Sequence, residues 1–250
     1  MLVIAHRGSN RKAPENSMEA FFTSIDEGAT RIELDLVLSK DKNIYICHDD
    51  NTSRTASKSL NISEASESEI SELRLSNGEP LPRIDTVLPL LDKVELNLEL
   101  KGNDPALVHV LMKKLEPLPS EKLERIILSS FSVPICEEAA SKASHLRRAF
   151  LWEPTDLDQD GTNWQRIRDG LSAAKTHIFH PYVCSYDEEM AKFCKSEDLV
   201  VYSWAPMLLD EWSDTSTWEN IYSLGIDGHC TNFPLELANF LRQKRINNLN

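Results

Sequence analysis

The sequence predicts an α/β fold, a TIM (β/α)8 barrel with a small insertion after the second strand. Short apolar segments alternate eight times with amphipathic segments, the connections are short, and 250 residues is a usual length for such a barrel. Alternating strands and helices favour a parallel sheet, and eight strand–helix pairs are enough to close it. We therefore expect residues 1–250 to form one barrel domain.

Each predicted strand is a short, largely apolar run. The eight runs are Leu2–Ala5, Arg31–Asp35, Glu95–Leu100, Arg125–Ser129, Arg147–Leu151, His177–His180, Leu199–Trp204 and Gly228–Thr231. The first predicted helix begins at about Glu15, where Asn16 or Ser17 can cap it, and stops near Gly28. The remaining helices are expected to begin near Asp85, Asp104, Pro134, Asn163, Asp187, Thr215 and Pro234.

One region breaks the alternation after the second strand. Ile44–His48 has the pattern of an extra strand, and a polar stretch, 39–43, joins it to the second strand. Residues 51–83 follow and are rich in Ser, Asn and Glu. We expect residues 51–83 to be an insertion that packs over one end of the barrel.

Composition and charge narrow the classes of partner. The formal net charge is −13, which argues against nucleic acid because affinity for the phosphate backbone comes from clustered basic residues.

The five cysteines are odd in number and lack C-x-x-C spacing, which favours a reducing compartment. The apolar run before His6 is too short for a signal peptide or a membrane span. We expect a cytoplasmic protein without a membrane span, and the sequence leaves its oligomeric state open.

The second predicted strand carries two carboxylates on one face. Side chains alternate along a strand, so Glu33 and Asp35 point one way while their apolar neighbours point the other way. In a barrel the polar face looks into the lumen, where adjacent carboxylates repel and lose solvent, which is costly without a cation between them. The alternative is an edge strand whose acidic face is solvated.

The third predicted strand repeats this pattern. Its Glu99 and Lys101 share the polar face at the C-terminal end, which is the end of a TIM barrel that carries the active site. Glu33, Asp35 and Glu99 together make an all-oxygen ligand set for one divalent cation, which suits Mg²⁺ or Ca²⁺ rather than zinc. Lys101 can bind a phosphate, pair with Glu99, or do both.

Two histidines and an arginine end strands at the same side. His6 and Arg7 follow the first strand, and His48 ends the extra strand. A guanidinium can grip two phosphate oxygens at once, which makes Arg7 a candidate phosphate ligand. A single histidine after a strand is more often structural, but two histidines near a metal and a basic pair suit acid/base cleavage of a phosphodiester. One would take a proton from the attacking hydroxyl, and the other would give a proton to the leaving oxygen.

The other histidines and one tryptophan carry less information. Trp204 ends the seventh predicted strand, where a core position and a position in the wall of a substrate pocket are equally compatible with the sequence. Histidines in the last three strands could line the lumen. Structural or surface roles are expected for His109, His145, His177, His180 and His229.

A series of short motifs runs through the chain in a specific order. It comprises His6-Arg-Gly, Ala13-Pro-Glu-Asn-Ser, Glu27-Gly-Ala, Ile32-Glu-Leu-Asp-Leu, Ser39-Lys-Asp, His48-Asp-Asp with Arg54-Thr55, Leu81-Pro-Arg-Ile-Asp-Thr-Val-Leu88, Asn97-Leu-Glu-Leu-Lys101, Ser129-Ser-Phe131, Trp204 and Gly225-Ile-Asp-Gly-His-Cys-Thr-Asn-Phe-Pro234. In this series and its spacing the chain resembles the glycerophosphodiester phosphodiesterase family over nearly its whole length, although no single motif is decisive.

The resemblance implies a role for each candidate residue. In such enzymes the residues matching Glu33, Asp35 and Glu99 hold one divalent cation. Those matching His6 and His48 are the acid/base pair, and those matching Arg7 and Lys101 contact the phosphate. The resemblance also implies hydrolysis of a glycerophosphodiester, such as glycerophosphocholine or glycerophosphoethanolamine, to glycerol 3-phosphate and an alcohol. The glycerol 2-hydroxyl would attack phosphorus first, and water would then open the cyclic phosphate.

Three segments depart from the usual family pattern. Asn51-Thr-Ser53 replaces a Thr-Leu-Asp-like run, Trp204-Ala-Pro-Met207 replaces Trp-Thr-Val-Asn, and Thr231-Asn232-Phe-Pro234 replaces Thr-Asp-x-Pro. These changes leave the cation ligands and the acid/base pair intact. The last two are expected where the leaving group rests, so they put the choice of substrate in doubt.

Two other functions remain open. A lysophospholipase D-like activity on a lipid diester would use the same catalytic set, but it would need an apolar groove or membrane contact, and the sequence has no amphipathic anchor. A barrel that binds glycerophosphodiesters without catalysis is the other alternative. The intact histidines and carboxylates argue against it.

Overall fold

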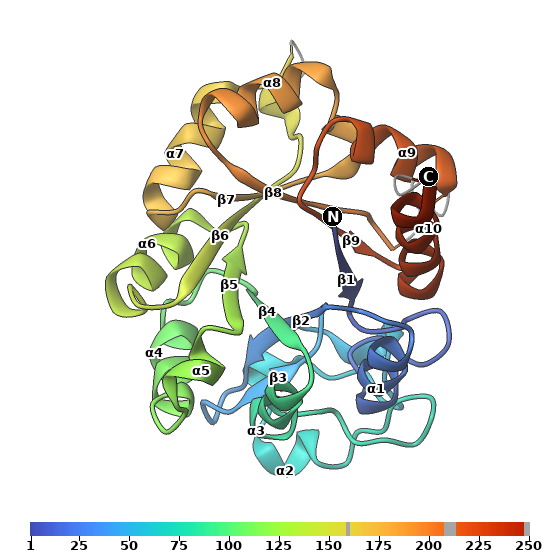
Figure 1. The fold of residues 1–250 in the computed structure, drawn as a ribbon. Helices are drawn as coiled ribbons and strands as arrows, with labels where there is room; N and C mark the ends of the chain where they lie inside the picture. The colour runs from blue at the N-terminus through green and yellow to red at the C-terminus, as the bar shows by residue number, and fades with distance from the viewer. Residues whose placement is uncertain (159–160, 208–213, 248–250) are drawn as a thin grey trace.

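A closed ring of eight parallel strands forms the centre of the molecule, and helices surround it (Figure 1). The computed structural model describes residues 1–158, 161–207 and 214–247. Neighbouring strands pair in the order β1-β9-β8-β7-β6-β5-β4-β2, and the pairing of β1 with β2 closes the ring. The strands are β1 (Leu2–His6), β2 (Arg31–Leu38), β4 (Glu95–Leu100), β5 (Ile126–Ser130), β6 (Arg147–Trp152), β7 (Ile178–Pro181), β8 (Val200–Trp204) and β9 (Gly228–Thr231). The predicted TIM barrel is confirmed.

A helical segment follows each barrel strand, directly or after an insertion. The segments are α1 (Met18–Asp26), α3 (Ile84–Val87), α4 (Ala106–Leu115), α6 (Val133–Lys142), α7 (Trp164–Ala174), α8 (Glu188–Ser196), α9 (Thr215–Ser223) and α10 (Pro234–Asn247). Ser17 caps α1 by accepting from the backbone N–H of Ala20 at 3.0 Å. Two further short helices, α2 (Glu67–Ile70) and α5 (Ser120–Leu123), were not expected from the sequence.

The alternation of side chains along β2 and β4 sets the core. Leu34 and Leu98 are fully buried in a cluster that also takes Leu107 and Leu111 from α4. The apolar face of each strand therefore packs on the helices outside the ring. Because neighbouring side chains on a strand point to opposite faces, the polar residues between these leucines are directed into the lumen.

The insertion after the second strand packs against the C-terminal part of β2. β3 (Ile44–Ile46) runs antiparallel to β2, and residues from 51–83 build a small cluster of their own over Val37 and Tyr45. Ile62, Ile70 and Leu73 are its fully buried members. β3 ends at Ile46, so the predicted strand was two residues too long, and His48 lies in the loop that follows.

Candidate active site

Strand register brings the predicted site residues together. The pairing of β1 with β2 sets His6 beside Glu33, and the pairing of β2 with β4 sets Asp35 beside Glu99. His6 and Glu99 lie at or next to the C-terminal ends of their strands, where TIM barrels carry their active sites, and Glu33 and Asp35 lie beside them on β2. Three separate segments of the chain therefore converge on one point.

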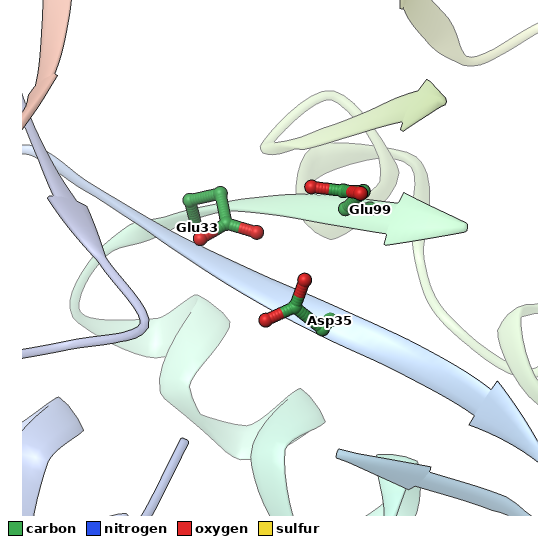
Figure 2. Close-up of side chains that lie close together, drawn as sticks. All are labelled: Glu33, Asp35 and Glu99. Carbon is green, nitrogen blue, oxygen red and sulfur yellow. The ribbon is translucent and has the colours of Figure 1, made fainter. Parts of the chain in front are cut away.

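Three carboxylates meet in the lumen. One ligand oxygen from each of Glu33, Asp35 and Glu99 lies within 4.8 Å of the others, and Figure 2 shows the side chains directed toward one another from two neighbouring strands. Their exposed fractions are 4%, 1% and 8% respectively. The alternative of a solvated acidic edge strand is therefore wrong.

Burial makes this cluster electrostatically costly. Burial, together with the neighbouring carboxylates, raises the pKa of Glu33 well above its ordinary value. Burial also raises the pKa of Glu99, with Lys101 opposing it. Burial would raise the pKa of Asp35 as well, but Arg7 and Lys101 outweigh it and hold that pKa below its ordinary value. Two of the three carboxylates thus lack enough positive charge nearby to ionise easily.

The residues present fit a hard divalent cation. Within the described residues, Oε1 of Glu33 and Oδ1 of Asp35 are buried and have no hydrogen-bond partner. Such oxygens are expensive to bury unless something positive faces them. An all-carboxylate donor set suits Mg²⁺ or Ca²⁺. The cluster could therefore bind a cation.

A strained turn aims Arg7 at the carboxylates. Arg7 has a left-handed backbone, with φ of 56°, and its N–H donates to Oε2 of Glu33 at 3.1 Å. The next residue must be Gly8, because its φ is +78° and a Cβ there would lie 2.7 Å from the backbone carbon of Ala20. The guanidinium Nε lies 3.2 Å from Oδ2 of Asp35. The turn thus places a permanent cation beside the cluster.

Lys101 is a second cation at the same place. Its Nζ donates to Oε1 of Glu99 at 2.6 Å and lies 3.6 Å from Oδ1 of Asp35. Burial would lower the pKa of Lys101, but Glu99 and Asp35 outweigh it and raise that pKa. The expected ion pair with Glu99 is confirmed, and the lysine stays charged beside the cavity.

His6 is a buried imidazole. Its Nδ1 lies 2.8 Å from Oδ1 of Asn232, and its Nε2 lies 4.0 Å from Oε2 of Glu33. Burial, with Arg7 nearby, lowers the pKa of His6 to about 3. The ring is therefore unprotonated near neutral pH.

A chain of ion pairs from the loop after β3 and from the insertion holds the side chain of His48. Its Nδ1 lies 2.7 Å from Oδ1 of Asp49, whose other oxygen accepts from Nε of Arg54 at 2.8 Å. Arg54 also donates to both oxygens of Glu15, at 2.5 and 2.8 Å, and Glu15 accepts from Arg7 at 3.0 Å. The side chain of His48 is 31% exposed, so solvent reaches it. The insertion therefore connects His48 to Arg7.

These groups line one cavity of about 410 Å³. That volume is in the range of small-molecule sites. Seven of the eight predicted site residues line it: His6, Arg7, Glu33, His48, Glu99, Lys101 and Trp204. The eighth, Asp35, lies within the carboxylate cluster.

The other side of the cavity is aromatic. Trp204 at the end of β8 and Phe131 after β5 meet at 86°, with 5.5 Å between ring centroids, and the ring centroid of Tyr182 lies 4.9 Å from that of Trp204. The Trp204 indole N–H donates to the backbone carbonyl of Trp152 at 3.2 Å. Since Trp204 lines the cavity, it belongs to the pocket wall and not to the closed core.

Several residues that shape the site were not singled out from the sequence. Glu15 and Arg54 form the bridge to His48, and both lie in motifs that carried the family resemblance. Glu153, after β6, lines the cavity beside the aromatic wall, and no sequence signal marked it. Asn232, in a segment expected where the leaving group rests, contacts His6. His180 is buried on the cavity wall, so one of the histidines expected to line the lumen does so.

A barrel with an acidic cluster, two imidazoles and two cationic side chains at its C-terminal strand ends has the architecture of an enzyme. The chain belongs to the glycerophosphoryl diester phosphodiesterase family, whose model matches residues 6–236. It is therefore a phosphodiesterase, and so a hydrolase.

Known relatives agree with this assignment. A glycerophosphodiester phosphodiesterase from Caldanaerobacter subterraneus subsp. tengcongensis is 27% identical over 97% of this chain and 98% of its own. A lysophospholipase D from Mus musculus is 30% identical over 46% of this chain and 40% of its own. The structure of a phosphodiesterase from Oleispira antarctica, in complex with its product sn-glycerol-3-phosphate, shares the fold with a TM-score of 0.84. That protein is 22% identical to this chain, and the match covers 97% of each. No helix in the described part of the chain is long and apolar enough to cross a membrane.

Proposed function

We propose that this protein hydrolyses glycerophosphodiesters with a cationic head group, such as glycerophosphocholine or glycerophosphoethanolamine, to glycerol 3-phosphate and the free alcohol. One observation carries the proposal. A buried carboxylate cluster, two histidines and two permanently charged cations line or adjoin a single cavity of about 410 Å³. Phosphodiester cleavage needs these groups together, because charge has to be neutralised on phosphorus while protons move at two oxygens.

The carboxylates and the cations divide the binding of the phosphate between them. Glu33, Asp35 and Glu99 would hold one divalent cation, Mg²⁺ or Ca²⁺, which when bound stabilises negative charge on the phosphate oxygens. Arg7 and Lys101 contact the same phosphate from the protein side. Their charges are already held in place by buried carboxylates, so little reorganisation is needed when the substrate binds.

The two histidines move the protons. His6 accepts the proton of the glycerol 2-hydroxyl through Nε2 while that oxygen bonds to phosphorus. His48 donates a proton to the departing alcohol oxygen as its bond to phosphorus breaks, which leaves a cyclic phosphate. Water then opens the ring with the two roles exchanged, giving glycerol 3-phosphate and restoring both histidines. The buried, neutral His6 and the more exposed His48 support this division of roles.

The aromatic wall opposite the carboxylates favours a substrate with a cationic head group. Phe131 and Trp204 offer two rings at nearly a right angle, and faces of aromatic rings attract quaternary ammonium groups. Glu153, an exposed carboxylate, lines the same cavity. A choline or ethanolamine group would bring its positive charge near that carboxylate.

The test is release of glycerol 3-phosphate from glycerophosphocholine by thoroughly chelated protein, with and without added Mg²⁺ or Ca²⁺. We expect no activity after chelation and recovery with one of the two cations. A panel of glycerophosphodiesters with choline, ethanolamine, glycerol and inositol head groups should rank the cationic ones first. Binding of glycerophosphocholine without turnover under every metal condition would instead indicate the non-catalytic barrel.

The aromatic wall also favours a second candidate, a lysophospholipase D-like activity, since an acyl chain could lie against Phe131, Leu151 and Trp204. Lysophosphatidylcholine decides between the two, with release of choline as the readout for both substrates, because its phosphate product keeps the acyl chain. A kcat/KM higher for lysophosphatidylcholine than for glycerophosphocholine would replace the first candidate with the second.

A further inference from the structure

Asn232 contacts His6 from the far end of the chain. The pairing of β1 with β9 sets Ala5 opposite Thr231, so the residues that follow, His6 and Asn232, emerge next to each other. Asn232 is fully buried and is not among the residues that line the cavity. Any effect that it has on a bound substrate must therefore act through the residues that it touches.

Its hydrogen bonds decide which way the amide points. Asn232 Nδ2 donates to the backbone carbonyl of Pro206 at 2.9 Å, and a carbonyl can only accept. Oδ1 therefore faces the other way, 2.8 Å from Nδ1 of His6 and 2.9 Å from Nδ2 of Asn10, which donates to it. The reversed amide would place two acceptors against each other at Pro206 and two donors against each other at Asn10.

This orientation decides the tautomer of His6. An amide oxygen carries no hydrogen, so Nδ1 of His6 must be the donor of their hydrogen bond. In the neutral ring, Nε2 then holds the free lone pair. Asn10 adds a second restraint, because its Nδ2 also donates to the backbone carbonyl of His6 at 2.6 Å.

We propose that Asn232 is a positioning residue that holds His6 with its hydrogen on Nδ1, so that Nε2 is ready to accept the proton of the attacking hydroxyl. The inference rests on the proposed function, because it takes His6 as the base. An aspartate here would also accept from His6, but its second oxygen would face the Pro206 carbonyl. An asparagine satisfies both neighbours and leaves the imidazole neutral.

The variant that tests the proposal is Asn232→Leu, which has nearly the same size but no acceptor. We expect kcat on glycerophosphocholine to fall roughly 10- to 100-fold, as for other residues that orient a functional histidine, while KM changes by less than about threefold. In a His6→Ala background, Asn232→Leu should cost nothing further, because its effect requires the imidazole. The matched control is Ser203→Ala. Ser203→Ala removes a 2.8 Å hydrogen bond to His229, which is a buried histidine like His6. Because His229 is not among the cavity-lining residues, kcat should be unchanged.

A spectroscopic measurement keeps the proposal testable even if Asn232→Leu folds poorly. Nitrogen NMR of histidine-labelled, metal-free protein reports the tautomer directly, with the signals of His6 identified by their loss in His6→Gln. We expect hydrogen on Nδ1 and a bare Nε2. Hydrogen on Nε2, or an undiminished effect of Asn232→Leu in the His6→Ala background, would overturn the positioning role of Asn232 and leave the proposed function intact. If His6→Ala itself costs no more than a few-fold, the proposed base fails and the inference fails with it.

Discussion

The two halves of the barrel mouth hold their side chains in different ways. On the side built by β1, β2 and β4, buried charges are linked by hydrogen bonds and ion pairs that run from the carboxylate cluster through Arg7 and Glu15 to Arg54. On the side built by β5 to β8, Phe131 and Trp204 meet through ring contacts, and Glu153 is exposed. The first half is a connected electrostatic network, and the second is mainly a set of aromatic rings in contact.

This difference indicates a division of labour. A network of buried charges orients groups before the substrate arrives, which is what stabilises a transition state. Aromatic rings offer weaker contacts, which a head group can make without any rearrangement of the protein. Changes in the network should therefore act on turnover, and changes in the aromatic half should act on the choice of substrate.

The largest effect is expected from the carboxylates. Glu33→Ala, Asp35→Ala and Glu99→Ala should each weaken cation binding and lower kcat by roughly 10³-fold or more, because several kcal/mol of charge stabilisation are lost. Glycerol 3-phosphate release and titration calorimetry with Mg²⁺ or Ca²⁺ measure the two effects. Glu153→Ala is the control, a carboxylate of the other half that should bind the cation normally. Full activity of the chelated wild type would refute the cluster's role.

The histidines should come next. His6→Ala and His48→Ala should each lower kcat on glycerophosphocholine by roughly 10²–10⁴-fold. A p-nitrophenyl leaving group needs little protonation, so His48→Ala should lose far less on such a substrate, whereas His6→Ala should lose about equally on both. Selective rescue of His6→Ala would show that the roles are reversed. Losses of only a few-fold for both would exclude acid/base catalysis by this pair.

Arg7→Lys should follow, with kcat/KM lower by about 10²-fold. Lysine keeps the charge but loses the planar fork that can hold two phosphate oxygens, and it cannot reproduce the contacts of Arg7 with Glu15 and Asp35 together. Steady-state kinetics on glycerophosphocholine measure the loss. Near-normal kcat/KM in Arg7→Lys would show that a point charge is sufficient there.

The aromatic half should give smaller effects that depend on the head group. Trp204→Leu and Glu153→Gln should raise KM for glycerophosphocholine by about 2- to 30-fold, the range of one cation–π contact or one exposed charge. KM for glycerophosphoinositol, which carries no cationic group, should change little. Equal effects on both substrates would mean that the wall does not recognise positive charge.

The last expectation concerns stability without the cation. A folded-state pKa of Glu33 above its unfolded value means that the folded chain binds more protons, so ionisation of Glu33 lowers stability as pH rises above about 4.5. Glu33→Gln cannot ionise. In chelator, the melting temperature of Glu33→Gln minus that of the wild type should therefore increase from pH 5 to pH 8. Added Mg²⁺ or Ca²⁺ should reduce this difference by stabilising the wild type. A gap independent of pH would contradict the raised pKa.

The sequence by itself determined the barrel and most of its catalytic half. Period-two alternation in β2 and β4 separates leucines from carboxylates, and an apolar face must be buried against the helices. That alone directs Glu33, Asp35 and Glu99 into the lumen, and the common polarity of parallel strands puts His6 and Lys101 at the same end. Local pattern is sufficient there because each residue's direction follows from its own strand.

The tertiary structure decided what depends on loops and on strand pairing. Glu15 and Arg54 meet because the insertion folds back over α1, and Asn232 reaches His6 because β9 closes the ring beside β1. The aromatic wall needs the residues after β5 and β6 and the end of β8 to converge on one cavity. A side chain in a loop has no periodicity to aim it, and contacts across 226 residues of chain arise only when the barrel closes.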